Sequence, residues 1–197
     1  PALHPFSDQG QYYNRPMIIS TKFTHADLLT APDDGKRREI LDGEIFVTPS
    51  PIADHQTIVL NFAFALRSYL LDHPIGKVYI APLDVIFTEF DVLEPDLLFV
   101  LNEHRATVKD WVRGAPDLVV EVLSPTTASR DRGIKLRAYA RFGVLEYWIA
   151  DPEVRAVEVY RLKRKGYELA RTLEEGSNLT STLLPQFTLQ ISAVFMM

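Results

Sequence analysis

The sequence predicts a mixed α/β (α+β) fold in which helices flank a mixed central β-sheet. Strand-like and helix-like segments are interleaved along the 197 residues without strict alternation, which favours a mixed sheet with helices on its faces. The run at 118–123 is apolar, β-branched and bounded by turn formers, as is typical of a buried central strand. Short strand-like runs separated by turns close the chain, which predicts a C-terminal antiparallel meander.

The first third of the chain predicts an arm, a short helix and a hairpin. Residues 1–20 contain Pro and Gly without clear periodicity, so we interpret them as an N-terminal arm. Thr24 with Asp27 three residues on resembles a capping box, which predicts a helix start. Two short runs within 38–47 are joined by Asp42-Gly43, and both turn residues tolerate positive φ, which predicts an N-terminal β-hairpin.

Two longer helices are expected. At 54–71 apolar residues recur at helical spacing, which predicts a broad buried face, and Asp54 or Ser50 is the expected cap. At 130–142 a second helix is predicted to end at Gly143. The remaining strand-like runs lie at 77–81, 84–88, 97–100, 145–150, 156–162 and 167–171.

Composition limits the classes of protein. A hydrophobic content of 47% and a charged content of 24% are ordinary for a globular protein, and the length predicts one domain over 1–197. There is no cysteine, so a metal would need oxygen or nitrogen ligands. The net charge of −5 argues against coating nucleic acid by charge alone, but permits an enzyme with a local basic face.

Nothing in the sequence predicts a membrane partner. No apolar run approaches the ~20 residues that span a bilayer, and the first residues lack the plan of a signal peptide. We therefore expect a cytoplasmic protein. A homo-oligomer is left open.

Glu121 is the first candidate site residue, because it interrupts the apolar run at 118–123. Side chains alternate along a strand, so Val119, Glu121 and Leu123 share one face. A buried, unpaired carboxylate costs several kcal/mol, roughly, unless it is neutralised, paired or bound to metal. A buried salt bridge and a metal site are both open at this point.

Asp96 is the second candidate. It follows Glu94-Pro95 and leads directly into the run at 97–100, where a structural turn is one reading. On a strand adjacent to Glu121, however, two carboxylates would repel, so the pair is favourable with a divalent cation between them or a lysine beside them.

The helix at 130–142 offers that lysine. Lys135 lies fourteen residues after Glu121, on an element that must pack back over the sheet. Asp131 lies one turn before Lys135, so an exposed i,i+4 ion pair is the alternative. Basic residues on the same helix either face solvent or contact phosphates; the candidates for nucleic-acid binding are Arg130, Arg132 and Arg137.

Together these residues carry a family resemblance. Pro95-Asp96, then Glu121 in an apolar strand, then a helix with Lys135, resembles the PD-(D/E)XK restriction-endonuclease-like superfamily. More specifically, residues 36–195 resemble its Uma family of endonucleases, long filed as a domain of unknown function. The phrases that carry the match are Leu41-Asp42-Gly43-Glu44, Pro49-Ser50-Pro51 with His55, Glu94-Pro95-Asp96, Val120-Glu121-Val122-Leu123-Ser124-Pro125, Lys135 with Tyr139, and Gly143-Val144-Leu145-Glu146-Tyr147-Trp148 running to Asp151-Pro152.

The resemblance implies a core of helix, three strands, helix and strand, and metal-dependent cleavage of DNA. It implies that Asp96 and Glu121 hold Mg²⁺ (or Mn²⁺), with the Val122 backbone carbonyl as a further ligand. Lys135 would orient the attacking water or stabilise the developing oxyanion. One departure is that the superfamily's usual lysine position, two residues after the acid, is Leu123 here, so Lys135 must reach the site from the helix.

Four accessory candidates remain: Glu44 after the hairpin turn, His55 at the start of the long helix, Asp84 before an apolar run, and Tyr139 one turn beyond Lys135. Each has a structural alternative: an exposed acid, a solvent-facing histidine, a structural acid and a core tyrosine. Two other functions also stay open. One is a catalytically inactive nuclease-fold protein that binds metal or nucleic acid or acts in assembly, and the other is a metal-dependent hydrolase of a small phosphoester.

Overall fold

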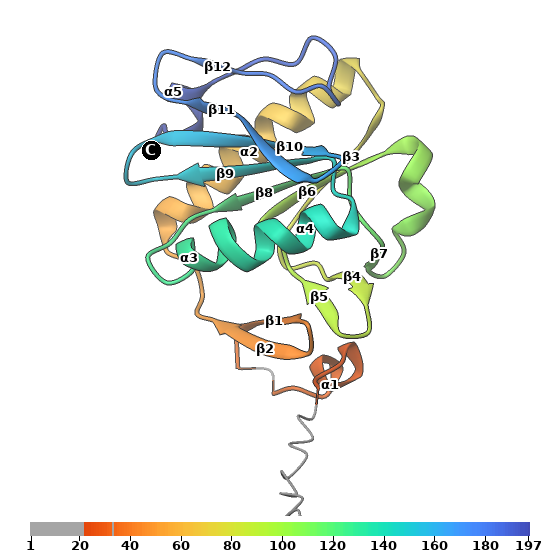
Figure 1. The fold of residues 1–197 in the computed structure, drawn as a ribbon. Helices are drawn as coiled ribbons and strands as arrows, with labels where there is room; N and C mark the ends of the chain where they lie inside the picture. Colours follow the sequence, from red (N-terminus) through yellow and green to blue (C-terminus); the bar gives the residue numbers. More distant parts are fainter. Residues whose placement is uncertain (1–21, 33) are drawn as a thin grey trace, which may run out of the picture.

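A six-stranded sheet forms the centre of the protein (Figure 1). The computed structural model describes residues 22–32 and 34–197, so the arm predicted at 1–20 lies outside the described residues. The strand order is β11-β10-β9-β8-β6-β3. β8 and β9 run parallel, whereas the other neighbouring pairs are antiparallel, which confirms the mixed sheet. The strands are β3 Gly76–Ile80, β6 Leu97–Leu101, β8 Leu118–Val122, β9 Glu146–Asp151, β10 Ala156–Lys163 and β11 Gly166–Leu173.

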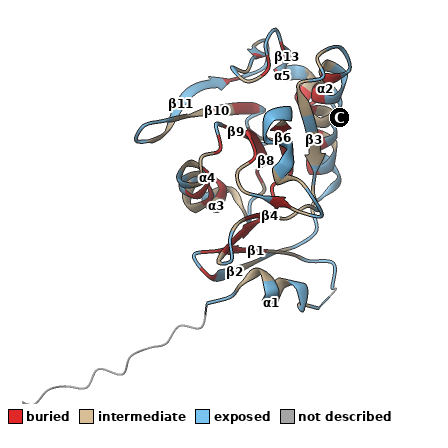
Figure 2. Cartoon of the chain, turned by 90° about the vertical axis from the view of Figure 1, so that its right-hand side faces the viewer, coloured by how far each residue is buried: buried red, intermediate tan, exposed pale blue. Residues whose placement is uncertain are grey.

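Helices cover both faces of this sheet (Figure 1). The long helix α2 (Ala53–Asp72) packs through Ile58, Phe62 and Leu66 onto a cluster that contains Leu118, Val120 and Val122 of β8. On the opposite face, Val119 and Leu123 pack with Ala138 and Tyr139 of α4 (Leu136–Phe142). The alternation predicted for this strand is therefore confirmed. In Figure 2 the buried residues are concentrated in the middle of the sheet and on the inner side of the helices.

A second, five-stranded sheet lies below the first in Figure 1, in the order β2-β1-β5-β4-β7. It contains the predicted hairpin, whose turn residues Asp42 and Gly43 have φ of 51° and 84°. The run predicted at 84–88 forms a strand of this sheet, so the three core strands are β3, β6 and β8. The members are β1 Arg37–Leu41, β2 Glu44–Thr48, β4 Val85–Thr88, β5 Asp91–Leu93 and β7 Val112–Arg113.

The predicted helix at 130–142 is not one continuous α-helix. It consists of α3 (Ala128–Arg130), a π-helical turn η2 (Asp131–Lys135) and α4. Gly143, with φ of 92°, ends α4 as predicted. A π turn widens the helix locally and is frequent at functional sites, and here it contains the two residues that turn inward, Asp131 and Lys135.

The other elements are short. The predicted capping box starts α1 (His25–Leu29), with Thr24 and Asp27 bonded to each other. The predicted side-chain cap of α2 is wrong, because Ile52 is the N-cap residue and makes no side-chain hydrogen bond. Asp54 lies inside the first turn, where its negative charge interacts favourably with the helix dipole. The remaining elements are η1 Asn102–Thr107, β12 Asn178–Leu179, β13 Leu189–Gln190 and α5 Ile191–Val194. Among the described residues no helix is long and apolar enough to cross a membrane.

Candidate active site

Asp96 and Glu121 come together where β6 begins and β8 ends. These strands pair antiparallel, with Leu97 opposite Val120. One residue further along this register, Asp96 lies opposite Glu121. The Val122 N–H donates to Asp96 Oδ2 at 2.9 Å, which ties the two strands at the acids. Asp96 and Glu121 are only 4% and 2% exposed. The structure thus brings together the carboxylate pair expected from sequence.

Lys135 completes this arrangement from the π turn. Its ammonium lies 2.8 Å from Glu121 Oε1, 2.8 Å from Glu39 Oε1 and 3.6 Å from Asp131 Oδ1. The exposed ion pair with Asp131 considered above is not what forms, because the Lys135 side chain is 4% exposed. Lys135 therefore reaches Glu121 from the helix, which is the contact it needs if it replaces the lysine that is absent at Leu123.

Glu39 is a site residue that the sequence analysis missed. It lies on β1, is 3% exposed, and accepts the Glu94 backbone N–H at 3.0 Å with the same oxygen that Lys135 approaches. Arg130 lies 3.8 Å from its other oxygen. The sequence offered a signal for Glu39, an acid directly before Ile40-Leu41 in a hairpin strand. This resembles the pattern that singled out Glu121, but the segment was interpreted only as part of the hairpin.

Asp96 is also held by two cationic or polar side chains. Arg37 Nη1 lies 2.7 Å from Oδ1, and its Nε lies 2.7 Å from Glu94 Oε1. His55 Nε2 lies 3.1 Å from Oδ2, while its buried Nδ1 has no hydrogen-bond partner among the described residues. A cavity of about 350 Å³ reaches Asp96, Arg37 and His55 from outside, past Ser50 and Pro82. This cavity is a route by which a ligand could approach Asp96.

The pKa values of Glu121 and Lys135 are both raised, but burial acts on them in opposite directions. Burial raises the pKa of Glu121 to about 8, and the charges of Asp96, Asp131 and Glu39 act in the same direction against Lys135. Burial alone would lower the pKa of Lys135, but Glu121, Glu39 and Asp131 hold it above its usual range. Lys135 is therefore cationic at neutral pH.

Asp96 behaves differently from Glu121. Burial acts to raise its pKa, but the bond to His55, the charge of Arg37 and the Val122 N–H together hold the pKa well below its usual range. In contrast, burial raises the pKa of Glu94 to about 7, against the charge of Arg37. The pKa of Asp96 is thus lowered while that of Glu121 is raised, and such a difference between two carboxyl groups of one site is characteristic of functional sites.

Tyr139 lines the site as well as the core. Its hydroxyl donates to Glu121 Oε1 at 2.8 Å, so this oxygen accepts from both Lys135 and Tyr139. The other Glu121 oxygen accepts no hydrogen bond from the part of the chain that the structure describes. Burial and the neighbouring Glu121 raise the pKa of Tyr139 well above its usual value, so the hydroxyl remains a donor.

In the described part of the chain, the other accessory candidates form no hydrogen bond or ion pair with the central residues, although the charges of Asp84 and Glu94 act on each other. Glu44 is exposed on β2. Asp84 is partly buried and lies 3.4 Å from His25, with a pKa that burial raises. Neither contacts Asp96, Glu121 or Lys135 within the described residues.

The three arginines proposed for nucleic acid differ from one another. Arg130 turns inward to Glu39 and Thr48. Arg132 is paired with Asp151 and Glu158 at 2.8 and 2.6 Å. Arg137 is exposed and makes no ion pair with any residue between 22 and 197 that the structure describes. Of the three, Arg137 has the guanidinium that is free to contact a phosphate.

Charge balance tests whether a divalent cation fits. Around the site lie five carboxyl groups and three permanently cationic groups; the acids are Glu39, Glu94, Asp96, Glu121 and Asp131, and the cations are Arg37, Arg130 and Lys135. No ready-made cage of three or more His, Asp or Glu ligands is found among the described residues. Because burial raises the pKa values of Glu94 and Glu121 to about 7 and about 8, the acids hold little excess charge at neutral pH. The second oxygen of Glu121 nevertheless suits a hard cation that takes oxygen ligands.

Comparison with known proteins identifies the family and the fold. Residues 25–192 match the family model "Uma2: Putative restriction endonuclease". The crystal structure of a nuclease from Anabaena variabilis ATCC 29413, described as "putative" and as belonging to DUF820, aligns with a TM-score of 0.75 at 20% identity over 88% of this chain and 97% of that one. The type IIG restriction endonuclease BpuSI aligns with a TM-score of 0.41 at 15% identity over 79% of this chain and 17% of that enzyme. No curated protein matches.

The fold is that of a mixed α/β protein like the DUF820 nuclease structure, and the family match places the chain among the restriction-endonuclease-like proteins. Because the family model covers most of the chain, the protein belongs to the Uma2 family. Membership supports a nuclease-like function.

Proposed function

We propose that this protein is a divalent-metal-dependent endonuclease that hydrolyses DNA phosphodiester bonds. The observation that carries the proposal is the contact of Lys135 with Glu121 at 2.8 Å, beside Asp96 on the neighbouring strand. Two acids on adjacent strands and one cationic donor are what metal-assisted phosphodiester hydrolysis requires. Belonging to Uma2 and having a nuclease-like fold support the same reaction class.

Asp96 and Glu121 would hold Mg²⁺ or Mn²⁺, with the Val122 carbonyl as a further ligand. When bound, the cation would lower the pKa of a water molecule and neutralise phosphate charge. For this, Glu121 must be ionised, and its raised pKa shows that the site without a cation disfavours that state. The free oxygen of Glu121 is the one available to a cation, since Lys135 and Tyr139 occupy the other.

Lys135 would act on the reacting groups. Its ammonium is held on three sides by Glu39, Glu121 and Asp131, so its position is fixed before substrate arrives. A fixed cation next to a developing oxyanion lowers the barrier, and loss of one such donor costs about 10²–10³ in rate. Tyr139 and Glu39 are positioning residues for Glu121 and Lys135.

A specific observation favours the second candidate function, a catalytically inactive nuclease fold. Arg37 occupies Asp96 Oδ1 at 2.7 Å, so one proposed metal ligand is already neutralised by a side chain of the protein. Such a site would bind metal weakly and would suit binding or assembly instead of cleavage.

Cleavage assays separate the two. Plasmid and single-stranded DNA are incubated with Mg²⁺ or Mn²⁺ and the native protein, the Glu121→Gln variant, or Glu168→Gln, which removes an exposed acid of β11. We expect metal-dependent cleavage by the native and Glu168→Gln proteins and none by Glu121→Gln. Equal cleavage by Glu121→Gln, or no cleavage with either metal, would refute the proposed activity. Titration calorimetry with Mn²⁺ then shows whether a binding site remains.

A further inference from the structure

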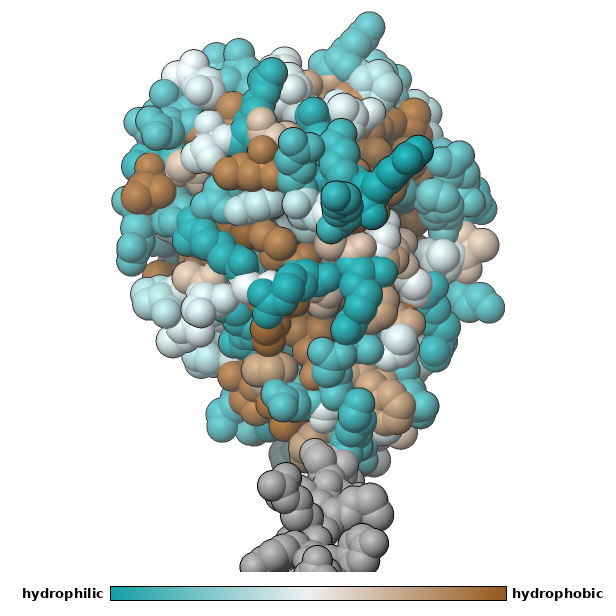
Figure 3. Space-filling view, viewed as in Figure 1, coloured by the Kyte–Doolittle hydropathy of each residue, from teal (hydrophilic) through white to brown (hydrophobic). Residues whose placement is uncertain are grey.

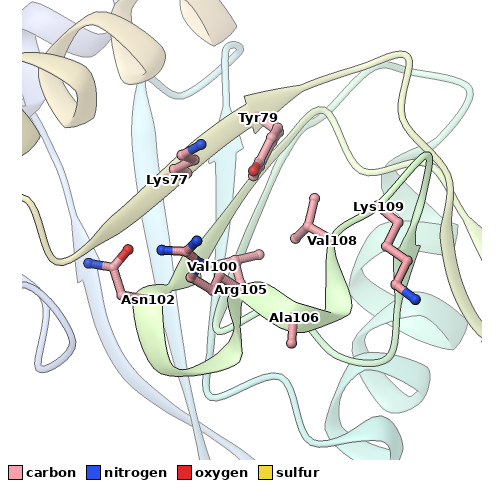
Figure 4. A pocket seen from close by; sticks show the side chains of 8 residues that line it. All are labelled: Lys77, Tyr79, Val100, Asn102, Arg105, Ala106, Val108 and Lys109. Atoms are coloured by element: carbon pink, nitrogen blue, oxygen red, sulfur yellow. The ribbon is translucent and has the colours of Figure 1, made fainter.

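A second cavity, of about 490 Å³, lies away from the acidic cluster (Figure 4). Its walls are the edge strand β3 and the segment that contains η1. The lining residues are Lys77, Tyr79, Val100, Asn102, Arg105, Ala106, Val108 and Lys109. Val100 is four positions along β6 from Asp96, about 13 Å at 3.3 Å per residue, so the two sites are separate.

The lining is cationic. Lys77, Arg105 and Lys109 contribute three positive charges, and no carboxylate lines the cavity. All three side chains are exposed, and none forms an ion pair within 22–32 or 34–197. This differs from Arg37, which is neutralised by carboxylates. In a protein with a net charge of −5, three unpaired cations around one cavity select for an anionic ligand.

The cavity also offers more than charge. Tyr79 is partly buried and packs against the core, so its ring is a fixed wall, and Val100 and Val108 add apolar surface. In Figure 4, Lys77 and Tyr79 project from β3 and Arg105 approaches them from the opposite wall. Cations beside an aromatic ring are the combination that binds nucleotides, with phosphate on the cations and the base on the ring.

The walls are held in place without a ligand. Asn102 donates from its backbone to Ile75 and from its side chain to Pro74 at 2.6 Å. The Val108 N–H donates to Arg105 at 3.1 Å. A preformed cavity of this size falls within the range of small-ligand sites, about 300–1,000 Å³, and is larger than a single phosphate needs.

From these observations we propose that the cavity between β3 and η1 is a nucleotide-binding site distinct from the acidic cluster. Lys77 and Arg105 bind the phosphate, and Tyr79 contacts the base. The nucleotide is either free or part of a single strand. The proposal does not depend on cleavage, because it can be tested without divalent metal.

The test is titration calorimetry in EDTA, with the Glu121→Gln background to prevent cleavage. The probes are inorganic phosphate, dAMP and a five-residue oligothymidylate. The site variant is Lys77→Gln/Arg105→Gln. The control is Arg164→Gln/Lys165→Gln, which removes the same charge from the exposed turn between β10 and β11, at the opposite edge of the sheet.

We expect dAMP or the oligonucleotide to bind more tightly than phosphate, the site variant to lose at least tenfold in affinity, and the control to stay within twofold. Tighter binding of the oligonucleotide than of dAMP identifies a strand as the source, and equal binding a free nucleotide. Tyr79→Leu should weaken dAMP binding about fivefold or more, as loss of one stacked base does, while leaving phosphate unchanged. Binding that is absent, that survives Lys77→Gln/Arg105→Gln, or that is no tighter for either dAMP or the oligonucleotide than for phosphate overturns the proposal.

Discussion

Replacing Lys135 by methionine tests the centre of the proposed mechanism. The change keeps the length of the side chain but removes a buried ammonium that lies 2.8 Å from both Glu39 and Glu121. Breaking a buried pair by removing one partner costs about 3–5 kcal/mol. For a chain of this length, this corresponds to a fall of about 6–20 °C in Tm, at about 2–4 °C per kcal/mol.

Protonation of Glu121 sets where in that range the loss falls. Its pKa is about 8 with Lys135 in place, and Lys135 acts to lower it. Glu121 is therefore mostly protonated at pH 7 without a cation, and loss of the lysine favours this neutral form further, which limits the uncompensated charge, so we expect about 3 kcal/mol. Cleavage should fall by at least about 10²-fold through loss of the cationic donor.

The assay combines thermal unfolding with plasmid cleavage. Lys165→Met, which removes an exposed lysine, should change neither readout. A double-mutant cycle with Glu121→Gln isolates the pair: Lys135→Met/Glu121→Gln should be more stable than Lys135→Met alone, because only Glu39 and Asp131 are then left without the lysine. If Lys135→Met folds and cleaves within threefold of the native protein, Lys135 is not the catalytic cation.

The other predictions concern the residues around this pair. Arg37→Met frees Asp96 Oδ1, so Mn²⁺ affinity by calorimetry should rise while Tm falls; weaker Mn²⁺ binding would contradict competition between the guanidinium and the metal. Glu39→Gln keeps the shape but removes a carboxylate that fixes Lys135, so cleavage should fall about tenfold, and an unchanged rate would show that Glu121 alone positions the lysine. In EDTA, the raised pKa values of Glu94 and Glu121, about 7 and about 8, mean that the folded state binds more protons than the unfolded state above pH 4.5. Stability by urea unfolding should therefore decline as pH rises from about 4.5 to 8, by about 1.4 kcal/mol per pH unit for each proton retained, and a rise over this range would refute these shifts.

Much of the fold follows from local signals. The hairpin at Asp42-Gly43 and the end of α4 at Gly143 are set by positive φ, which few residues adopt without cost. The alternation of β8 could be predicted because a strand buried on both faces has a strict two-residue period. These features depend on neighbouring residues only.

The second sheet could not be predicted in the same way. β5 and β7 have three and two residues, too few for a periodic pattern to develop. The π turn is a similar case, because the helical periodicity of 130–142 hardly changes when one extra residue enters a turn. The two buried charged residues of this helix, Asp131 and Lys135, nevertheless both lie in the π turn.

Lys135 was a candidate because its helix must pack back over the sheet, and the resemblance to the PD-(D/E)XK superfamily implied its role. Glu39 was missed, and the difference lies in how residues distant in sequence meet. Glu39 is separated from Glu94 by 55 positions and reaches the site because the hairpin packs below the central sheet. No local pattern encodes that packing. What sequence does record is the energetic problem: an acid in an apolar strand must be compensated, and both Glu39 and Glu121 meet this condition at one ammonium. Two such acids on separate strands therefore share one buried lysine, with Arg130 3.8 Å from Glu39, and this shared compensation is the contact that neither strand could predict alone.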